Sequence, residues 1–184
     1  EKAALAQPNN AIFQYNYGLI SEGNGDVETA ILCYSNALKI NPKHLNANIN
    51  VGKLYLDSQQ PDYALTFLQN AVAIDKTNFE AVNNLASCYR EKKEYDLAIE
   101  NYKKALSLDE GNLATCINLA NTYVASEKFQ EAKVMFTEVL QKDKTNKECY
   151  LELAKVCLML KNNSLAEGYL LKLQEIDSNY KKAE

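Results

Sequence analysis

Five cysteines are the side chains in this sequence most suited to metal binding or nucleophilic chemistry. They are Cys33, Cys88, Cys116, Cys149 and Cys157. None belongs to a Cys-x-x-Cys pair, and Cys149 and Cys157 would stand about 12 Å apart on one helix, which is beyond disulfide reach. We therefore predict five small buried apolar side chains in a reducing, cytoplasmic compartment, with no metal and no cofactor.

Other reactive groups are sparse. His44 is the single histidine and has no neighbouring cysteine or carboxylate that would make it a ligand or a base. The sequence contains no nucleophile elbow, phosphate loop or zinc-protease motif. Its net charge of −4, with scattered lysines and arginines, argues against nucleic acid as a partner, and no apolar run is long enough for membrane insertion. We predict that the segment is not an enzyme.

A recurring asparagine is the most suggestive polar feature. Asn16, Asn50, Asn84 and Asn118 follow one another at intervals of 34 residues. An amide side chain both donates and accepts hydrogen bonds, so a column of asparagines could hold the backbone of an extended peptide. The same period divides the chain into blocks 11–44, 45–78, 79–112, 113–146 and 147–180, without insertion or deletion.

Small residues mark where helices would cross within each block. Position 8 is always glycine or alanine: Gly18, Gly52, Ala86, Ala120 and Ala154. Position 20 is always alanine: Ala30, Ala64, Ala98, Ala132 and Ala166. Two helices approach to about 8–10 Å only where side chains are small, so we expect the first helix (helix A) and the second (helix B) of each block to touch here.

Spacing and punctuation also favour helices. The apolar residues Ala98, Ile99, Tyr102, Ala105 and Leu106 recur with helical periodicity. Position 34 holds a residue able to cap the next helix A, asparagine in most copies and His44 in one, where histidine is expected as a variant cap. Pro61 stands near the start of its helix B, where its missing N–H does no harm. Each pair buries little surface alone, so the pairs must stack.

This pattern of small and aromatic residues resembles the tetratricopeptide repeat family over residues 11–180, although the usual tryptophan at position 4 is absent. The resemblance implies an all-α fold, a right-handed α-solenoid of five tandem 34-residue helix-turn-helix repeats. We expect one continuous domain: residues 1–10 as the end of a preceding repeat helix, 11–180 as the repeat array and 181–184 as a tail. In such an array the uncapped ends either join further repeats or pack on another copy.

The family's concave surface, formed by the A helices, binds peptide segments, and this implies where a partner would lie here. The residues expected to line it are Asn16, Asn50, Lys53, Asn84, Ser87, Arg90, Asn118, Asn121 and Glu152. Apolar contacts would come from Tyr15, Leu19, Ile49, Leu56, Ile117 and Val124, unless these pack between helices. Three cations and six carboxylates at the concave positions give a net charge of −3, which favours a neutral or basic protein segment.

Two functions follow from the resemblance. The asparagine column is similar to that of the O-linked N-acetylglucosamine transferase superhelix, although asparagine is common at this position in the family. The chain would then be either a scaffold or adaptor for other proteins or the substrate-recognition arm of a larger enzyme, such as a glycosyltransferase. The family's two-carboxylate clamp for acidic chaperone tails is not present, because only Asn50 matches among Tyr15, Leu19, Asn50, Glu80 and Asn84.

Overall fold

The computed structural model describes residues 10–183, and the side chains of residues 10–177. The predicted end of a preceding repeat helix therefore lies almost wholly outside the described residues. The chain divides into two compact units, residues 1–94 and 95–184, and the boundary falls between the two helices of the third repeat.

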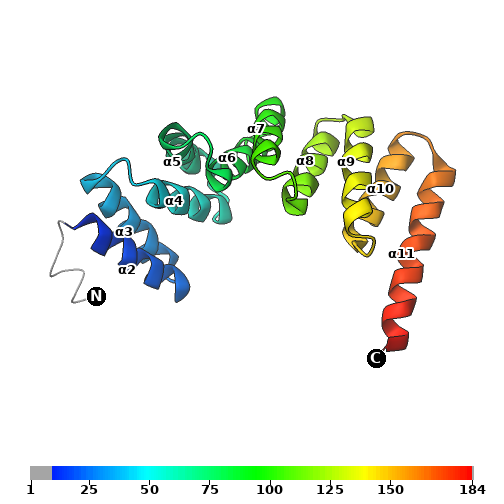
Figure 1. Ribbon diagram of the computed structural model, residues 1–184, viewed down its shortest axis with the longest axis horizontal. Coiled ribbons are helices and arrows are strands. Elements are labelled where there is room, and N and C mark those ends of the chain that lie inside the picture. The colour runs from blue at the N-terminus through cyan, green and yellow to red at the C-terminus, as the bar shows by residue number, and fades with distance from the viewer. Residues whose placement is uncertain (1–9, 184) are drawn as a thin grey trace. The chain divides into compact units, whose positions relative to one another are not determined.

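Ten α-helices and no strand are found among the described residues (Figure 1). Unit 1 contains α2 (Ala11–Gly23), α3 (Val27–Ile40), α4 (Leu45–Asp57), α5 (Pro61–Ile74) and α6 (Phe79–Glu91). Unit 2 contains α7 (Tyr95–Leu108), α8 (Leu113–Ala125), α9 (Phe129–Lys142), α10 (Lys147–Met159) and α11 (Asn163–Ala183). The all-α helical repeat is confirmed.

The expected caps begin the A helices. Asn78 Oδ1 accepts a hydrogen bond from the backbone N–H of Ala81 at 2.9 Å, and Asn10, Asn112 and Asn146 act in the same way. His44 is confirmed as a variant cap, because its Nδ1 accepts from the N–H of Ala47 at 3.3 Å. Pro61 is the first residue of α5. These contacts satisfy donors that the first helical turn leaves unpaired.

The small residues lie at the helix crossings, as predicted. All five alanines at position 20 are buried. A Cβ added to Gly18 would lie 2.5 Å from the Tyr34 ring, and one added to Gly52 would lie 2.5 Å from Cγ of Leu68. Both distances are shorter than van der Waals contact, so only glycine lets helix B approach this closely.

The turn between helices A and B contains a backbone feature that the sequence did not indicate. Position 15 of every repeat has a positive φ, near 60° at Gln59, Lys93, Glu127 and Lys161, and 78° at Gly25. Only the first repeat places glycine there. For the other four residues the left-handed conformation costs about 1–2 kcal/mol each, which the packing of the helix pair must offset.

Candidate peptide-binding surface

The A helices of unit 1 carry three members of the predicted asparagine column, one each on α2, α4 and α6. Asn16 is exposed, whereas Asn50 and Asn84 are half-buried. Their repeat positions are identical, but the residues around them differ. The three asparagines therefore have different roles in the structure.

Asn50 hydrogen-bonds within the protein. Its side chain hydrogen-bonds to the hydroxyl of Tyr34, a fully buried residue of the preceding helix B. The same hydroxyl donates to Oε2 of Glu22 at 2.6 Å. Burial is the main reason that the pKa of Tyr34 is raised above its usual value, and the Glu22 carboxylate raises it further. This network ties the first repeat to the second and leaves Asn50 partly occupied.

Lys53 belongs to the same network. Its Nζ lies 4.0 Å from Oε1 of Glu22, and its side chain remains about half exposed to solvent. A pair this open contributes little to stability. It does, however, place a positive charge beside Glu22 on the surface expected to meet a partner.

Asn84 differs from Asn50 because the repeat positions that supply the Asn50 network are apolar in the next repeat. Where the first repeat has Tyr34, the second has Leu68, and where the first has Glu22, the second has Leu56. Among the described residues, Nδ2 of Asn84 is buried and has no hydrogen-bond partner. Leaving a buried amide donor unpaired costs about 1–3 kcal/mol, so Asn84 would gain from an acceptor brought by another molecule.

The remaining predicted residues of unit 1 lie on α6. The Ser87 hydroxyl donates to the Asn83 carbonyl at 3.2 Å, and Arg90 Nη2 lies 2.8 Å from Oε1 of Glu91. Lys53 and Arg90 thus both face carboxylates. Asp57 and Glu80 are exposed and form no ion pair with another described residue, so the A-helix surface of unit 1 carries excess negative charge.

In unit 2 the predicted residues lie on α8 and α10. Asn118 and Asn121 are half-buried on α8, and the Asn118 carbonyl accepts a hydrogen bond from the Thr122 hydroxyl at 2.7 Å. Glu152 forms an ion pair with Lys155 at 2.7 Å, with most of the Glu152 side chain shielded from solvent. The position that holds asparagine in the other copies is therefore anionic in α10.

Two of the apolar candidates are packing residues. Ile49 is only 2% exposed and packs with Ala71 and Ala81. The ring of Tyr15 lies 4.5 Å from that of His44 and 5.5 Å from that of Tyr34, measured between centroids. Leu19, by contrast, is 42% exposed and is available to a partner.

The cysteines are free and buried, as predicted. Burial raises the pKa of Cys88 to about 11 and that of Cys149 to about 12, so both are protonated thiols at neutral pH. Within the described residues, no group of three His, Cys, Asp or Glu side chains could hold a metal ion. No described helix is long and apolar enough to cross a membrane.

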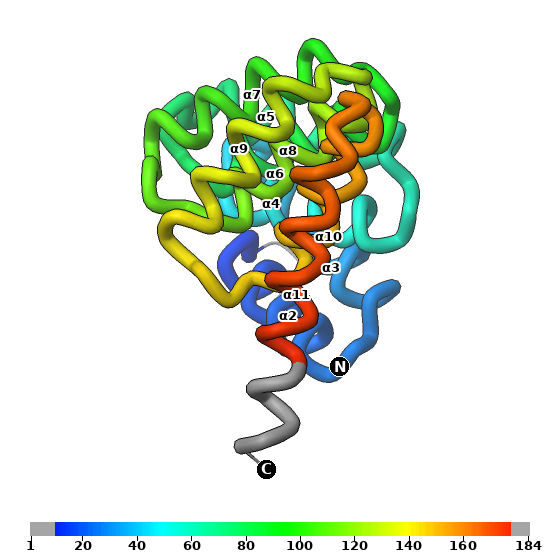
Figure 2. The backbone as a smooth tube through the Cα atoms, turned by 90° about the vertical axis from the view of Figure 1, so that its right-hand side faces the viewer, coloured from blue at the N-terminus to red at the C-terminus, as the bar shows by residue number. Residues whose placement is uncertain are grey.

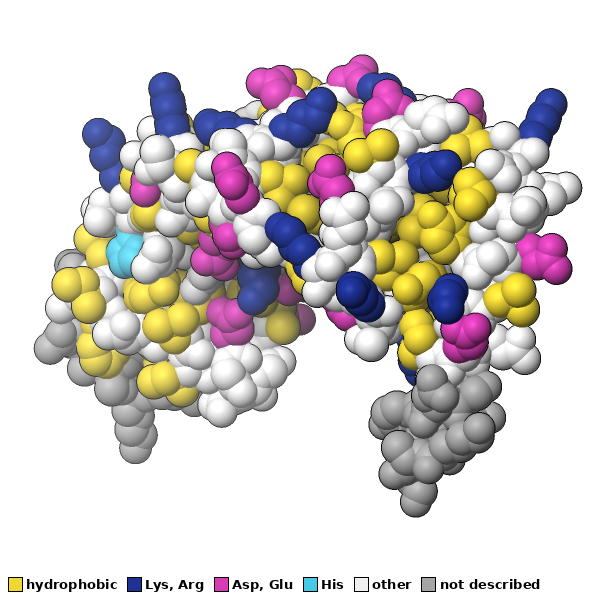
Figure 3. Space-filling view, turned by 45° about the vertical axis from the view of Figure 1, so that its right-hand side comes forward, with side chains coloured by type: hydrophobic (Ala, Val, Ile, Leu, Met, Phe, Trp, Pro, Cys, Tyr) yellow, Lys and Arg dark blue, Asp and Glu magenta, His cyan; other side chains and the backbone are white. Residues whose placement is uncertain are grey.

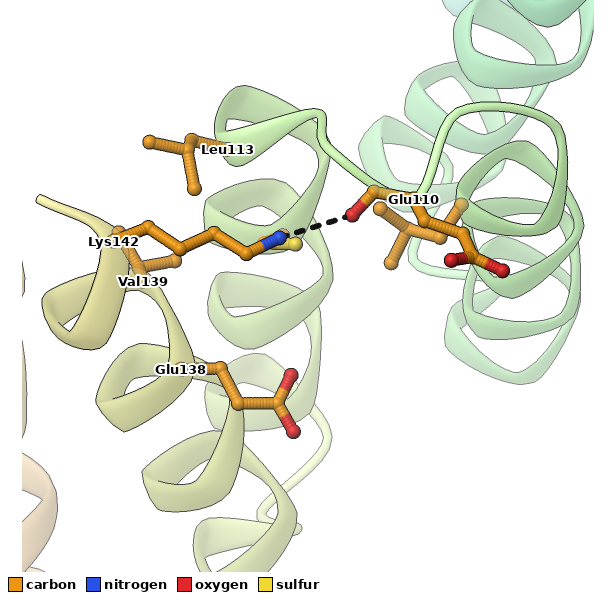
Figure 4. Close-up of a pocket in the computed structure, with 7 residues that line it drawn as sticks. Glu110, Leu113, Glu138, Val139 and Lys142 are labelled. Carbon is orange, nitrogen blue, oxygen red and sulfur yellow. Dashed lines mark hydrogen bonds between the residues drawn. The ribbon is translucent and has the colours of Figure 1, made fainter.

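A small pocket lies between the end of α7, α8 and α9 (Figure 4). Lys142 extends across it and donates to the backbone carbonyl of Glu110 at 3.2 Å, with Glu138 on the same helix. Its volume is about 160 Å³. Ligand pockets usually occupy about 300–1,000 Å³, so this pocket is too small for a typical substrate.

Comparison with known families identifies the repeat. A tetratricopeptide repeat profile matches residues 79–112, and a second profile of the same description matches residues 22–87 and 123–183. The chain belongs to the tetratricopeptide repeat family. Folds of this family are typically scaffolds that take part in protein interactions.

Solved structures share this fold at low sequence identity. A crystal structure of MamA matches with a TM-score of 0.90 at 21% identity, covering 97% of each chain. YrrB, described as a tetratricopeptide protein with an unusual peptide-binding site, matches with a TM-score of 0.83 at 18% identity, covering 95% of this chain and 90% of YrrB. PilF of Pseudomonas aeruginosa matches with a TM-score of 0.74 at 22% identity, covering 90% of this chain and 75% of PilF. No curated protein matches.

Proposed function

We propose that this chain is a protein-interaction scaffold whose A-helix surface in unit 1 binds an extended segment of a partner protein, with Asn84 holding the partner's backbone. The supporting observation is the buried Nδ2 of Asn84, which has no acceptor among the described residues. The Asn84 residue as a whole is half-buried, so a turn of its side chain would bring the amide to the surface. A backbone carbonyl of a bound segment would then supply the acceptor without requiring a particular sequence.

The charge of this surface favours a neutral or basic segment. Glu22 and Glu91 already accompany the two cations, whereas Asp57 and Glu80 are exposed without an ion pair to another described residue. An acidic segment would be repelled by these carboxylates. Leu19 offers apolar contact area beside Asn16. The YrrB description shows that a protein of this fold can hold a peptide, which agrees with the proposal.

The alternative, a recognition arm for an enzyme, depends on an asparagine ladder that acts uniformly. Asn50 is bonded to Tyr34, and the α10 member of the series is Glu152. A ladder with these interruptions is less suited to sliding recognition of many substrates than to holding one partner. The scaffold proposal is therefore the better supported of the two.

The test uses peptides selected from a random display library against the wild-type chain, with affinity measured by titration calorimetry. We expect Asn84→Ala to weaken binding by about fivefold to tenfold, since one charge-neutral hydrogen bond is lost. Asn101→Ala is the matched control, because Asn101 is a half-buried asparagine on α7 whose Nδ2 donates to the Leu97 carbonyl. Unchanged affinity in Asn84→Ala would refute the role of Asn84.

A second variant tests the reason that Asn84 is unpaired. Leu68→Tyr places in the second repeat the hydroxyl that Tyr34 supplies to Asn50 in the first, and Gly52 provides the space that Gly18 provides for Tyr34. We expect the new hydroxyl to occupy Asn84, so peptide affinity should fall while the free energy of unfolding stays level or rises. A tyrosine variant that bound peptide as well as wild type would contradict the proposal.

A further inference from the structure

A second surface, on the B helices of unit 2, is built differently. Figure 2 views the chain from the side on which α9 and α11 lie in front. Between them is a groove of about 460 Å³, here called the α9–α11 groove, with α10 forming its floor. Its main lining residues are Leu140, Lys144, Tyr150, Leu153, Leu165 and Tyr169. This volume lies within the range of about 300–1,000 Å³ that is usual for binding sites.

The groove contains a glycine where the other repeats have a side chain. Gly168 lies inside α11 at a position that other repeats fill with Leu32, Thr66, Glu100 or Val134. A Cβ added to Gly168 would have no atom within 4 Å, so close helix packing does not explain the glycine. Glycine inside a helix lowers its stability by about 1 kcal/mol relative to alanine. At Gly168 the missing side chain leaves this part of the α9–α11 groove empty.

The apolar walls carry lysines at their rim. Lys144 and Lys172 both line the groove, and none of its lining residues is an aspartate or glutamate. Lys172 Nζ is paired with Glu175 at 2.7 Å, and both side chains are about 61% exposed. A pair this exposed is weak, so a carboxylate from a partner can compete with Glu175 for the ammonium group. Figure 3 shows hydrophobic side chains gathered beside Lys or Arg side chains on the right-hand part of the view.

A related groove lies one repeat earlier in the same unit. It has a volume of about 330 Å³ and is formed by α7, α8 and α9, with Leu106, Tyr123, Val134 and Met135 among its lining residues. Lys103 stands at its edge, 5.9 Å from the Tyr123 ring centroid, and Glu131 also lines it. Because α9 borders both grooves, an elongated partner could place one apolar side chain in each.

We propose that the α9–α11 groove docks an acidic amphipathic helix of a partner protein, inserting an apolar side chain between Leu140 and Leu165 and directing carboxylates to Lys144 and Lys172. In helix-in-groove binding an amphipathic helix lays its apolar face in a hydrophobic groove, and charges at the rim select a partner of opposite sign. The α9–α11 groove has an apolar lining with Lys144 and Lys172 at its rim. The surface is separate from the A-helix surface of unit 1 and prefers a partner of opposite charge.

The probe is a synthetic helical peptide in which leucines recur at i and i+4 and glutamates surround them, with binding followed by fluorescence anisotropy. A matched peptide has lysine in place of every glutamate. We expect the glutamate peptide to bind the wild-type chain at least about tenfold more tightly than the lysine peptide, since rim charges set this preference. Failure of the glutamate peptide to bind, or equal binding of the two, would overturn the proposal.

The decisive variant fills the groove. Gly168→Leu has space for its side chain and favours the helix, so it should remain folded and lower the affinity for the glutamate peptide by about tenfold or more. Thr66→Leu is the control, because Thr66 is exposed at the same repeat position in unit 1. Unchanged affinity in Gly168→Leu would show that the peptide binds elsewhere.

Two further measurements separate the remaining outcomes. Lys144→Glu combined with Lys172→Glu should reverse the preference to the lysine peptide, and no reversal would refute the role of the rim.

Sedimentation velocity tests whether the groove is covered by a second copy. A wild-type dimer that Gly168→Leu converts to a monomer would overturn the peptide proposal, whereas Asn84→Ala should leave glutamate-peptide binding unchanged if the two surfaces are independent.

Discussion

The second repeat, in unit 1, and the fourth, in unit 2, carry a tyrosine at the same position but use it differently. In the second repeat, Tyr55 stacks on Tyr63 at 5.4 Å and on Phe67 at 5.9 Å, so aromatic rings fill the outer surface of the helix pair. In the fourth, Tyr123, Glu131 and Met135 line a groove of about 330 Å³. A single backbone design therefore gives a filled surface in one repeat and an open one in another, depending on two side chains of helix B.

Removing an aromatic ring from the filled repeat should have the largest effect. Phe67 is half-buried against the core cluster that includes Tyr34 and Val51, so we expect Phe67→Ala to lower the free energy of unfolding by about 2–3 kcal/mol. Met135→Ala, at the same position beside an existing groove, should cost about 1 kcal/mol. Urea denaturation followed by circular dichroism measures both. Equal losses would mean that the ring stack does not distinguish the repeats.

The glycines offer a test in which the two units should respond with opposite signs. In Gly52→Ala the new methyl group meets Leu68, and overpacking should outweigh the gain in helix propensity, for a net loss of about 1–2 kcal/mol. Gly168→Ala meets nothing and should raise stability by about 1 kcal/mol. Thermal and urea unfolding report both changes. The comparison would fail if both variants shifted in the same direction.

Transplanting the aromatic residues should convert the open repeat into a filled one. Glu131→Tyr together with Met135→Phe reproduces at the fourth repeat the residues that accompany Tyr55 in the second. We expect a stability gain of about 0.5–1.5 kcal/mol from ring packing against Tyr123. Either change alone should give less than half of the gain. If the double variant is no more stable than wild type, the groove is maintained by the backbone and not by these two side chains.

Alkaline pH should distinguish the units by an effect that is absent at neutral pH. Burial raises the pKa of Cys149 from about 9 to about 12, so above pH 9 the unfolded chain releases this proton while the folded chain keeps it. Stability from this thiol is complete below pH 9 and is lost as the pH rises towards 12. For Cys88 in unit 1 the loss ends near pH 11. The measurement is the free energy of unfolding of Cys149→Ala and of Cys88→Ala, each compared with wild type between about pH 8 and pH 12. It would show whether the pH ranges over which the two thiols lose their contribution differ.

The repeat, its helices and its crossing points could be predicted from the sequence because they depend on local rules. The repeat itself is visible as a period of 34 residues. Within it, the capping side chain before each helix A acts over a few residues, and the alanine at position 20 acts at one helix contact. The buried state of the cysteines was predicted from their spacing, which suits neither a metal site nor a disulfide. The left-handed residue in each A–B turn could not be predicted. Four of the five are not glycine, the residue that would have indicated a positive φ; they are Gln59, Lys93, Glu127 and Lys161.

The sequence alone thus determined the family, the order of helices and the residues that recur at the A-helix surface. Tertiary structure decided what each copy does, because neighbours that touch across helices are separated by many residues in the chain. Asn50 and Asn84 stand at the same repeat position. The Tyr34 hydroxyl hydrogen-bonds to Asn50, whereas Leu68, at the corresponding position, has no hydroxyl and Nδ2 of Asn84 stays unpaired. In the same way, only the structure shows that Gly168 stands beside empty space and not at a close helix crossing.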